Sequence, residues 1–501
     1  MTQQSYDVVV IGGGNAGLCA ALSARERGAR VLLLERSPAD QRGGNTAYTG
    51  GGMRMIHHGV ETVKSVVPDL SEGEIANTDF GQYTAEEYLE DLGRVTQWYC
   101  DPDLAETLVR NSTQTVQWLH GHGVRFVPRF GRYAFRHEGK FKFFGGTVVE
   151  AAGGGRGLVQ FEYTAAEKAG IDIRYGTQAV ALIRTRVGVT GVRVNVDGVE
   201  EDTIAATAVV LAAGGFEANR EWRTRYLGPG WDMAKVRGTR YNTGDGIRIA
   251  LDIGAQPYGQ WSGCHSVSWE RYALDFGELD RPITASRNGY PFGIMVNARG
   301  KRFVDEGVDF RNYTYAKYGR IVLEQPGSYA WQVFDAQVEH LLHDEYRSKG
   351  TTKVQADTLE ELVARMEDVE PEQFLKTVQQ YNAAITREVP FNPNVKDGRR
   401  TVGLEVNKSN WALVLEKPPF VAYAVTCGIT FTFGGLKIDT TAQVLDMADR
   451  PIPGLYAAGE LVGGLFYYNY PGSSGLMAGA VFGRIAGREA AAHALENRCA
   501  A

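Results

Sequence analysis

A short glycine-rich pattern near the N-terminus has the spacing that nucleotide binding requires. Residues 12–17 (GGGNAG) follow the apolar run Tyr6–Ile11 and open a stretch of small residues that extends to about Arg27. Glycines allow a tight turn, and the first amides of a following helix can approach a pyrophosphate. Glu35 lies 23 residues past Gly12, where its carboxylate can accept hydrogen bonds from ribose hydroxyls. This spacing predicts a dinucleotide with a free 2′-hydroxyl, either FAD or NAD.

Parallel strands must position this glycine turn. Tyr6–Ile11 and Val31–Glu35 are short runs rich in Val and Leu, which is typical of strands buried in a parallel sheet. With the helix between them they predict a β–α–β unit. Two later runs, Ala208–Gly215 and Gly454–Glu460, also end in Ala and Gly, where a large cofactor can pass close to the backbone. These two strand ends favour FAD over NAD.

The character of the sequence changes twice along the chain. Residues of about 261–425 mix aromatic and charged side chains with amphipathic helical stretches, whereas the residues after 425 return to glycine-rich patterns. We therefore expect an α/β fold built on a Rossmann-like FAD-binding domain, formed by residues 1–260 and 426–501. An inserted α+β capping domain is expected at 261–425.

Composition excludes several classes of protein. The 501 residues carry a net charge of −6 without a Lys- or Arg-rich tail, so we expect no nucleic-acid partner. No apolar stretch approaches about 18 residues, so no membrane span is expected. The N-terminus lacks signal-peptide features and the five cysteines are scattered, which together predict a cytoplasmic protein without disulfides. Paired histidines such as His57-His58 lack matching carboxylates, so no metal site is expected.

Several motifs, in the order in which they occur here, resemble one family. The chain contains GGNT at Gly43–Thr46, the strand ends at Ala208–Gly215 and Gly454–Glu460, and VNARGKRFVDE at Val296–Glu306. Together with the glycine turn they resemble the flavoproteins of the fumarate reductase/succinate dehydrogenase family over nearly the whole chain. The resemblance implies FAD as the cofactor, a capping domain, and hydride transfer between flavin N5 and a carbon beside an activating group.

The resemblance also implies a set of cofactor-binding residues by matching position. They are Gly12, Gly14, Asn15, Ala16, Gly17, Glu35, Arg36, Gly44, Asn45, Thr46, Gly51, Gly52, Val180, Ala213, Gly214, Gly459, Glu460, Ser474, Gly475 and Leu476. Membrane-bound members of the family carry a histidine beside the threonine here numbered Thr46, and that histidine attaches FAD covalently. Asn45 stands there in this chain, which implies FAD held without a covalent link.

Arg311 is the candidate for proton transfer. Soluble fumarate reductases use an arginine shortly after the motif that matches Gly300–Glu306, and Arg311 lies one residue further along than usual. Because the pKa of arginine exceeds about 12, it needs a relay partner, and Asp305, Glu306 and Asp309 are nearby in sequence. The alternative is that Arg311 forms a structural ion pair or binds a substrate carboxylate.

Two departures from the family pattern argue against fumarate or succinate as the substrate. Phe431 replaces a histidine of the fumarate reductases, and the run Asn469–Ser473 lacks their arginine. That run resembles the Tyr-Pro-Gly motif of 3-ketosteroid dehydrogenases, which implies that Tyr470 and the N–H of Ser474 hold an oxygen as it gains negative charge. His265 is a further candidate for the active site, with a purely structural histidine as the alternative.

Two segments, Arg42–Arg54 and Phe303–Ala316, most resemble the bacterial tricarballylate dehydrogenase branch. Enzymes of that branch oxidise a tricarboxylate and pass the electrons to a membrane iron–sulfur partner. Four arginines could then bind the substrate carboxylates: Arg54, Arg271, Arg287 and Arg311. The alternative for the first three is a plain surface arginine.

We therefore expect an FAD-dependent oxidoreductase that introduces or reduces a C–C double bond next to a carboxylate or ketone. One alternative is a 3-ketosteroid-type dehydrogenase or ene-reductase for a bulky ketone, favoured by aromatic residues such as Tyr48, Phe433 and Phe466. Another is an electron-relay subunit without a substrate of its own. No haem or iron–sulfur motif occurs in the sequence, so a separate electron-transfer partner is expected. The direction of the reaction stays open because it depends on that partner.

Overall fold

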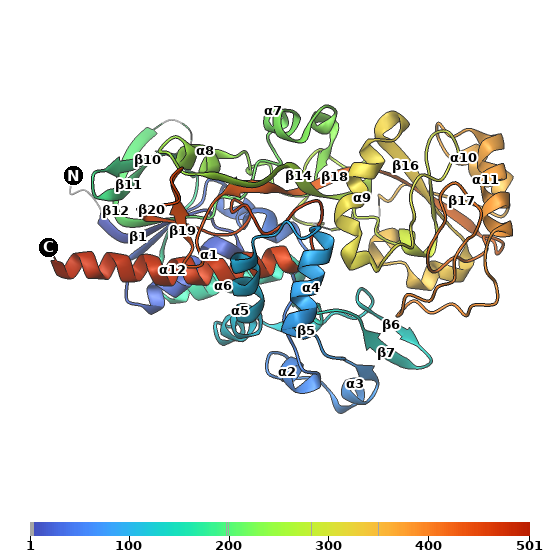
Figure 1. Ribbon diagram of the computed structural model, residues 1–501, viewed down its shortest axis with the longest axis horizontal. Helices are drawn as coiled ribbons and strands as arrows, with labels where there is room; N and C mark the ends of the chain where they lie inside the picture. Colours follow the sequence, from blue (N-terminus) through green and yellow to red (C-terminus); the bar gives the residue numbers. More distant parts are fainter. Residues whose placement is uncertain (1–4, 197, 199, 282, 349, 501) are drawn as a thin grey trace.

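The computed structural model describes residues 5–196, 198, 200–281, 283–348 and 350–500. The molecule is elongated, and both ends of the chain lie at the end that holds the first sheet, whereas α10 (Leu359–Arg365) and α11 (Pro371–Ala383) lie at the opposite end (Figure 1). Within the described ranges, no helix is both long and apolar enough to cross a lipid bilayer.

The first sheet is built around the strand that leads into the glycine turn. Strand β1 (Ser5–Ile11) pairs in parallel with β12 (Glu200–Leu211) on one side and β2 (Val31–Leu34) on the other. Its remaining strands are β9 (Asp172–Arg174), β10 (Thr177–Thr185), β11 (Gly188–Val196), β19 (Gln443–Leu445) and β20 (Pro451–Ala457). Because β20 pairs in parallel with β12, the C-terminal segment returns to this sheet.

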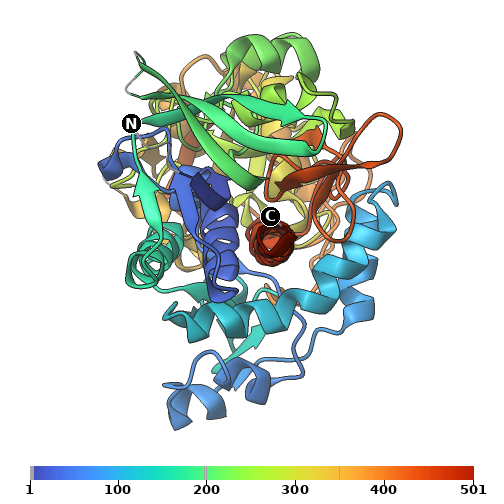
Figure 2. The same ribbon diagram turned by 90° about the vertical axis from the view of Figure 1, so that its left-hand side faces the viewer.

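Two helices cover one face of the first sheet. The first, α1 (Asn15–Glu26), packs along α12 (Ser474–Ala500), which Figure 2 shows nearly end-on. Glycines let the two backbones approach: a Cβ at Gly483 would lie 2.3 Å from the carbonyl oxygen of Ala16. Further helices on this side of the molecule are α4 (Ala85–Val95), α5 (Pro102–Gly121) and α6 (Gly154–Lys168), whereas α8 (Asp245–Leu251) packs beside β10 on the opposite side (Figure 1).

The second sheet is formed mainly by the segment expected as a cap. Its two longest strands, β14 (Pro257–Glu270) and β18 (Phe420–Leu436), pair in antiparallel fashion along most of their length. The other strands are β13 (Lys235–Val236), β15 (Ile294–Val296), β16 (Tyr329–Phe334) and β17 (Lys353–Ala356), and α9 (Tyr315–Leu323) packs on β14. The α/β class is confirmed. The boundaries at 261 and 425 remain a prediction, and both positions lie inside these two continuous strands.

Smaller elements join the two parts. The short helices are α2 (Val60–Lys64), α3 (Glu72–Ala76) and α7 (Arg220–Trp222). Two small sheets contain β3 (Gly52–Met53), β5 (Phe126–Pro128) and β8 (Val149–Ala151), and β4 (Thr78–Asp79), β6 (Ala134–His137) and β7 (Lys140–Phe143). The segment that begins with the GGNT motif at Gly43–Thr46 contains a 3-10 turn, Gly44–Tyr48.

Candidate active site

One long cleft runs from the glycine turn of the first sheet to strand β18 of the second. Backbone from residues 12–16 and 212–214 lines one end. The other end is lined by side chains of arginine, tyrosine and phenylalanine. The two ends therefore differ in what they can bind.

The glycine turn fits a pyrophosphate because its geometry excludes side chains. Gly12 has a φ of 107°, and a Cβ there would lie 2.3 Å from the carbonyl oxygen of Ala212. The first turn of α1 holds no acidic residue, so its positive end is free of a competing carboxylate. The amide of Asn15 donates to Thr46 Oγ1 at 3.1 Å, which ties the second glycine-rich segment to this helix end.

Glu35 closes the turn from the second strand. Its Oε2 accepts a hydrogen bond from the amide of Gly13 at 3.0 Å, and its Oε1 accepts one from the amide of Ser37 at 2.8 Å. Burial raises the pKa of Glu35, and these two amides and Arg36 oppose that effect. The carboxylate lines the cleft where a ribose would follow the pyrophosphate.

Most residues expected to contact the cofactor line the cleft. Those that do are Gly12, Gly14, Asn15, Ala16, Glu35, Arg36, Gly44, Asn45, Thr46, Gly52, Ala213, Gly214, Gly459, Glu460, Gly475 and Leu476. Gly17, Gly51, Val180 and Ser474 are not among the described lining residues. Gly17 instead packs inside the turn, since a Cβ there would lie 1.9 Å from the oxygen of Gly12, and Ala179 takes the place expected for Val180.

Asn45 is held by three hydrogen bonds. Its Nδ2 donates to Glu217 Oε1 at 2.5 Å and to the carbonyl oxygen of Thr430 at 2.7 Å. Its Oδ1 accepts from the amide of Thr239 at 2.9 Å. Asn45 therefore joins three segments at the middle of the cleft.

Glu217 and Glu460 form a buried acid pair beside Asn45. Glu460 Oε1 accepts from the amide of Thr432 at 2.9 Å, and Oε2 accepts from Asn242 Nδ2 at 3.3 Å. Burial, and then the charge of Glu460, raise the pKa of Glu217 well above its usual range. The pair therefore keeps a proton, with Glu217 as the neutral partner.

Aromatic side chains form the walls of the far end. The hydroxyl groups of Tyr315 and Tyr470 are hydrogen-bonded to each other. The ring of Phe431 lies 5.2 Å from that of Tyr470, and the ring of Phe466 lies 5.4 Å from it, both edge to face. This end therefore combines an apolar enclosure with two hydroxyls.

His265 lies behind this wall. It is fully buried, and its ring stacks on Phe431 with 5.1 Å between centroids. Neither ring nitrogen has a hydrogen-bond partner among the described residues. Burial and the charge of Arg237 hold the pKa of His265 well below its usual range, so the ring is neutral. His265 contacts Tyr315 and Tyr470 but does not itself line the cleft.

Four arginines line the same end, and two of them form ion pairs with carboxylates. Arg129 pairs with Glu150 at 2.7 Å, and Arg132 pairs with Glu345 at 2.5 Å. Within the described part of the chain, neither Arg237 nor Arg311 forms an ion pair with a carboxylate. Arg237 donates from Nη1 to Thr430 Oγ1 at 3.3 Å, and its buried Nε has no partner.

The surroundings of Arg311 contain none of the expected relay partners. Its Nη2 donates to the carbonyl oxygen of Arg132 at 3.0 Å. The three nearby carboxylates are bonded elsewhere: Asp305 to Ser409, Glu306 to Arg302, and Asp309 to Arg94. The structure thus places Arg311 in the cleft as a cation, without a carboxylate that could pass it a proton.

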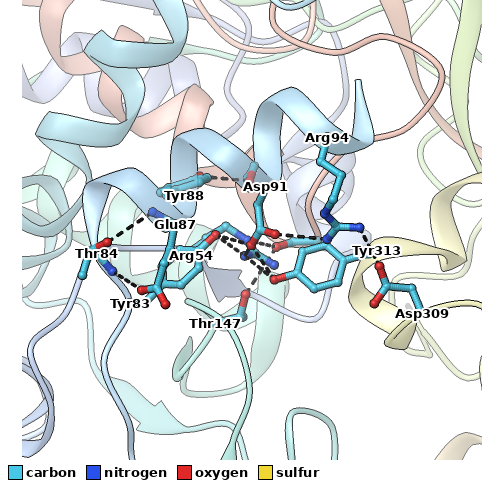
Figure 3. Close-up of polar contacts among 12 residues, drawn as sticks. Arg54, Tyr83, Thr84, Glu87, Tyr88, Asp91, Arg94, Thr147, Asp309 and Tyr313 are labelled. Atoms are coloured by element: carbon cyan, nitrogen blue, oxygen red, sulfur yellow. Dashed lines mark hydrogen bonds and ion pairs between the residues drawn. The ribbon is translucent and has the colours of Figure 1, made fainter. Parts of the chain in front are cut away.

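The other expected carboxylate grips lie outside the cleft. Arg287 pairs with Glu270 at 2.9 Å, and Arg271 with Asp368 at 3.2 Å. Arg54 is fully buried in a network with Tyr83, Asp91 and Tyr313 (Figure 3). Its Nε donates to the carbonyl oxygen of Gly472 at 2.8 Å, so it supports the turn after Tyr470.

That turn leads from Tyr470 into α12. Ser473 has a φ of 72°, which is unusual for a residue with a side chain, and Arg129 donates to its Oγ at 2.9 Å. The amide of Ser474 donates to the carbonyl oxygen of Pro471 at 3.1 Å, and its hydroxyl accepts from Tyr88 at 2.9 Å. Gly475, the next residue, lines the cleft.

Several lining residues carry no local signal in the sequence. Arg129, Arg132 and Tyr133 come from the connection between β5 and β6, and Arg237 follows the two-residue strand β13. A scattered arginine in a loop resembles any surface arginine. The pairing of β13 with β18, far along the chain, brings Arg237 to Thr430, and no local sequence pattern indicates that pairing.

Comparison with known proteins agrees with this geometry. Residues 7–476 match the family model described as an FAD binding domain. The chain is 30% identical over 502 residues to a probable fumarate reductase of Shewanella frigidimarina, covering 98% of this chain and 76% of that protein. It is 26% identical over 586 residues to a 3-oxosteroid 1-dehydrogenase of Mycolicibacterium smegmatis, covering 99% of each.

A solved structure also matches. The open conformation of a flavocytochrome c3 fumarate reductase superposes with a TM-score of 0.72 at 27% identity, covering 98% of this chain and 79% of that one. The cofactor is therefore FAD, and the protein is an oxidoreductase acting on C–C bonds. The chain belongs to the FAD-dependent fumarate reductase/succinate dehydrogenase flavoprotein family.

Proposed function

We propose that the protein introduces or reduces a C–C double bond next to a carboxylate. The observation that carries this proposal is Arg237, a guanidinium in the cleft with no carboxylate partner among the described residues and with a buried, unpartnered Nε. A buried cation is costly unless an anion pairs with it. A substrate carboxylate would supply that anion, and Arg311 would offer a second donor fork.

The cofactor-binding part of the proposal uses the residues at the other end. Gly12 and Gly14 at the start of α1 would hold the pyrophosphate, Glu35 the ribose, and Gly475 would lie against the flavin. When bound, FAD supplies a hydride acceptor or donor at flavin N5. The amide of Asn45 is no nucleophile and is fully engaged with protein partners, which supports a non-covalent cofactor.

The side chains at the substrate end would bind and polarise. Tyr470, with Tyr315 bonded to it, would donate to an oxygen of the activating group as that oxygen gains charge. The amide of Ser474 would join it only after releasing Pro471, to which it donates here. Phe431 and Phe466 would exclude water from the reacting carbons, which strengthens these hydrogen bonds.

The cleft favours one carboxylate on an apolar body over three carboxylates. The expected grips Arg54, Arg271 and Arg287 are engaged elsewhere, which leaves Arg237 and Arg311 as the unpaired cations of the described cleft. Tricarballylate stays in the proposal as the most highly charged candidate. An unsaturated or saturated acid with an aromatic or aliphatic body matches the walls better.

A bulky ketone is the second candidate. It is favoured by the hydrogen-bonded hydroxyls of Tyr315 and Tyr470, which could both serve one ketone oxygen, and by the surrounding phenylalanines. For either substrate we infer a separate electron-transfer partner, because the chain has no second redox motif of its own.

Anaerobic bleaching of the bound flavin tests the proposal. The panel would contain tricarballylate, succinate, saturated aromatic propionates, steroid ketones and cyclic enones, with reoxidation of reduced enzyme by the unsaturated partners. We expect carboxylates to react and R237Q to raise their Kd at least about tenfold, since a charge-assisted pair contributes about 1.5–3 kcal/mol.

R136Q is the matched control. Arg136 is an exposed arginine on β6, and its loss should leave the Kd unchanged. Bleaching by ketones alone would overturn the carboxylate assignment. Equal affinities in R237Q and R136Q would remove Arg237 from the site.

A further inference from the structure

We propose that Tyr133 is the catalytic residue that transfers the proton, and that Arg311 acts as the cation beside it. This assignment deepens the proposed function and rests on it. Nothing in the sequence marks Tyr133, which lies in the connection between two short strands. The case for it comes from where the fold puts its hydroxyl and what surrounds its ring.

Tyr133 lies where the turn after Tyr470 meets the cleft. Its side chain is 2% exposed and lines the cleft at the arginine-rich end. The hydroxyl lies 3.1 Å from the position that a Cβ on Gly472 would take. Ser473, whose Oγ accepts a hydrogen bond from Arg129 at 2.9 Å, is among the groups that lower the pKa of Tyr133.

Two guanidinium groups flank the ring itself. The guanidinium carbon of Arg129 lies 4.7 Å from the ring centroid, and that of Arg311 lies 5.0 Å from it. Arg54, under the same turn, adds a third positive charge. The acidic groups of the region are already committed: Glu150 pairs with Arg129, and Glu345 pairs with Arg132.

This arrangement stabilises a phenolate. Burial alone raises the pKa of Tyr133, but the charges of Arg129, Arg311 and Arg54, with a smaller contribution from Ser473, outweigh burial. The pKa of Tyr133 therefore lies below the usual tyrosine value of about 10. Nearby positive charges lower the pKa of a tyrosine because they stabilise its ionised, negatively charged form.

The other tyrosines at this end behave in the opposite way. Burial raises the pKa of Tyr470 and raises that of Tyr315 well above the usual value. Because their hydroxyls are bonded to each other, each stays neutral and can donate a hydrogen bond but cannot take a proton. The tyrosines therefore have two different roles. Tyr315 and Tyr470 polarise the activating oxygen, and Tyr133 exchanges the proton.

The proposed reaction conserves protons and electrons in both directions. In oxidation the substrate loses a proton from the carbon beside its activating group to the oxygen of Tyr133, and it loses a hydride from the next carbon to the flavin. The two electrons of the first C–H bond become the new π bond, and the phenolate becomes a neutral phenol. In reduction the phenol of Tyr133 returns the proton. Arg311 takes no part in the proton transfer and serves as the cation beside the phenolate.

Carbon NMR of the enzyme labelled with ¹³C at tyrosine Cζ tests the ionisation without any substrate. The FAD-loaded wild type should show one tyrosine that titrates below the ordinary range, and Y133F should lack that signal. R311Q should move the titration to higher pH, and R311K should restore most of it. Titration curves that are identical in the wild type and Y133F would overturn the proposal.

Turnover of a reactive panel substrate tests the role in catalysis. Proton transfer by a positioned side chain contributes about 10²- to 10⁴-fold, so Y133F should lose kcat by that factor while it retains FAD. The fall in the oxidation rate toward low pH should shift upward in R311Q. Y381F, which removes a buried hydroxyl from α11, is the matched control for folding. Full kcat in Y133F would overturn the proposal.

Failure of the proposed function gives a different result. If no panel compound reacts with the wild type, the substrate assignment fails, and the carbon titration alone then decides whether Tyr133 ionises. If compounds react and Y133F matches the wild type, the substrate assignment stands and Tyr133 loses its role.

Discussion

The two ends of the cleft differ in what lines them: backbone at one end and side chains at the other. At the end with the glycine turn, backbone forms much of the lining, and glycines such as Gly12 keep side chains out. At the proposed substrate end the lining consists of side chains, among them Arg237, Arg311, Tyr133 and Tyr470. A backbone site depends on spacing within one short segment. A side-chain site depends on where distant segments meet, so it can change by single substitutions while the cofactor end stays constant.

The largest expected effect comes from filling the backbone site. G12A would place a Cβ 2.3 Å from the carbonyl oxygen of Ala212 at a φ of 107°. Because neither strand can move without disturbing the parallel pairing of β1 and β12, the turn must open. We expect purified G12A to retain almost no FAD, measured by flavin absorbance per protein.

Gly28 supplies the matched control. It also has a positive φ, 86°, but a Cβ there meets no described atom within 4 Å. G28A should therefore suffer the left-handed strain alone, about 1 kcal/mol of unfolding free energy, and keep its FAD. If G28A lost FAD as completely as G12A, backbone strain rather than close approach would explain the site.

The nucleotide end could be predicted from the sequence because it is built within one short segment. The same local construction is the reason that G12A should be severe. Residues 12–17 and Glu35 form one β–α–β unit, and its strands and helix end within a residue or two of the predicted positions. The predicted strand 208–213 is the end of the longer β12, whose first half pairs with β11. Local periodicity does not show where such antiparallel pairing begins.

The substrate end was only partly predictable. Motifs surround Tyr470 and Arg311 in the sequence, and both residues line the cleft. The charge of Arg54 suggests a carboxylate grip, yet the fold buries it under the turn of Gly472, and no sequence pattern indicates Tyr133. Charge and residue type are visible in a sequence, but burial and partners are set by contacts between segments more than a hundred residues apart.

Breaking the support of the substrate end should have the next largest effect. R54M removes the donor to Gly472 and leaves Asp91 without its buried cation (Figure 3). Loss of one partner of a buried pair costs about 3 kcal/mol at the low end of the usual range, which is appropriate because Asp91 keeps Arg94. Urea unfolding should show this loss, and kcat should fall as the turn after Tyr470 loosens.

Arg94 tests whether the burial of Arg54 determines how much stability its loss costs. It belongs to the same network, pairing with Asp91 and Asp309, but its side chain is 42% exposed. Solvent screens such a pair, so R94M should lose at most about 1 kcal/mol. Equal losses in R54M and R94M would mean that the network acts through its surface and not through the turn.

The smallest expected effect concerns Glu217, where the two ends meet at Asn45. The raised pKa of Glu217 means that the folded protein holds a proton that the unfolded chain, with a glutamate pKa near 4.3, releases. That contribution to stability is complete below pH of about 4.3 and is lost as pH rises toward the folded pKa.

E217Q keeps an oxygen for Asn45 and removes the titration of Glu217. Between pH 5 and 6 the wild type should therefore lose about 1 kcal/mol more unfolding free energy than E217Q. E90Q, which removes an exposed carboxylate on α4, should follow the wild type. Parallel curves for the wild type and E217Q would show that the pair binds no extra proton, and the junction of the two ends would then be held by Asn45 alone.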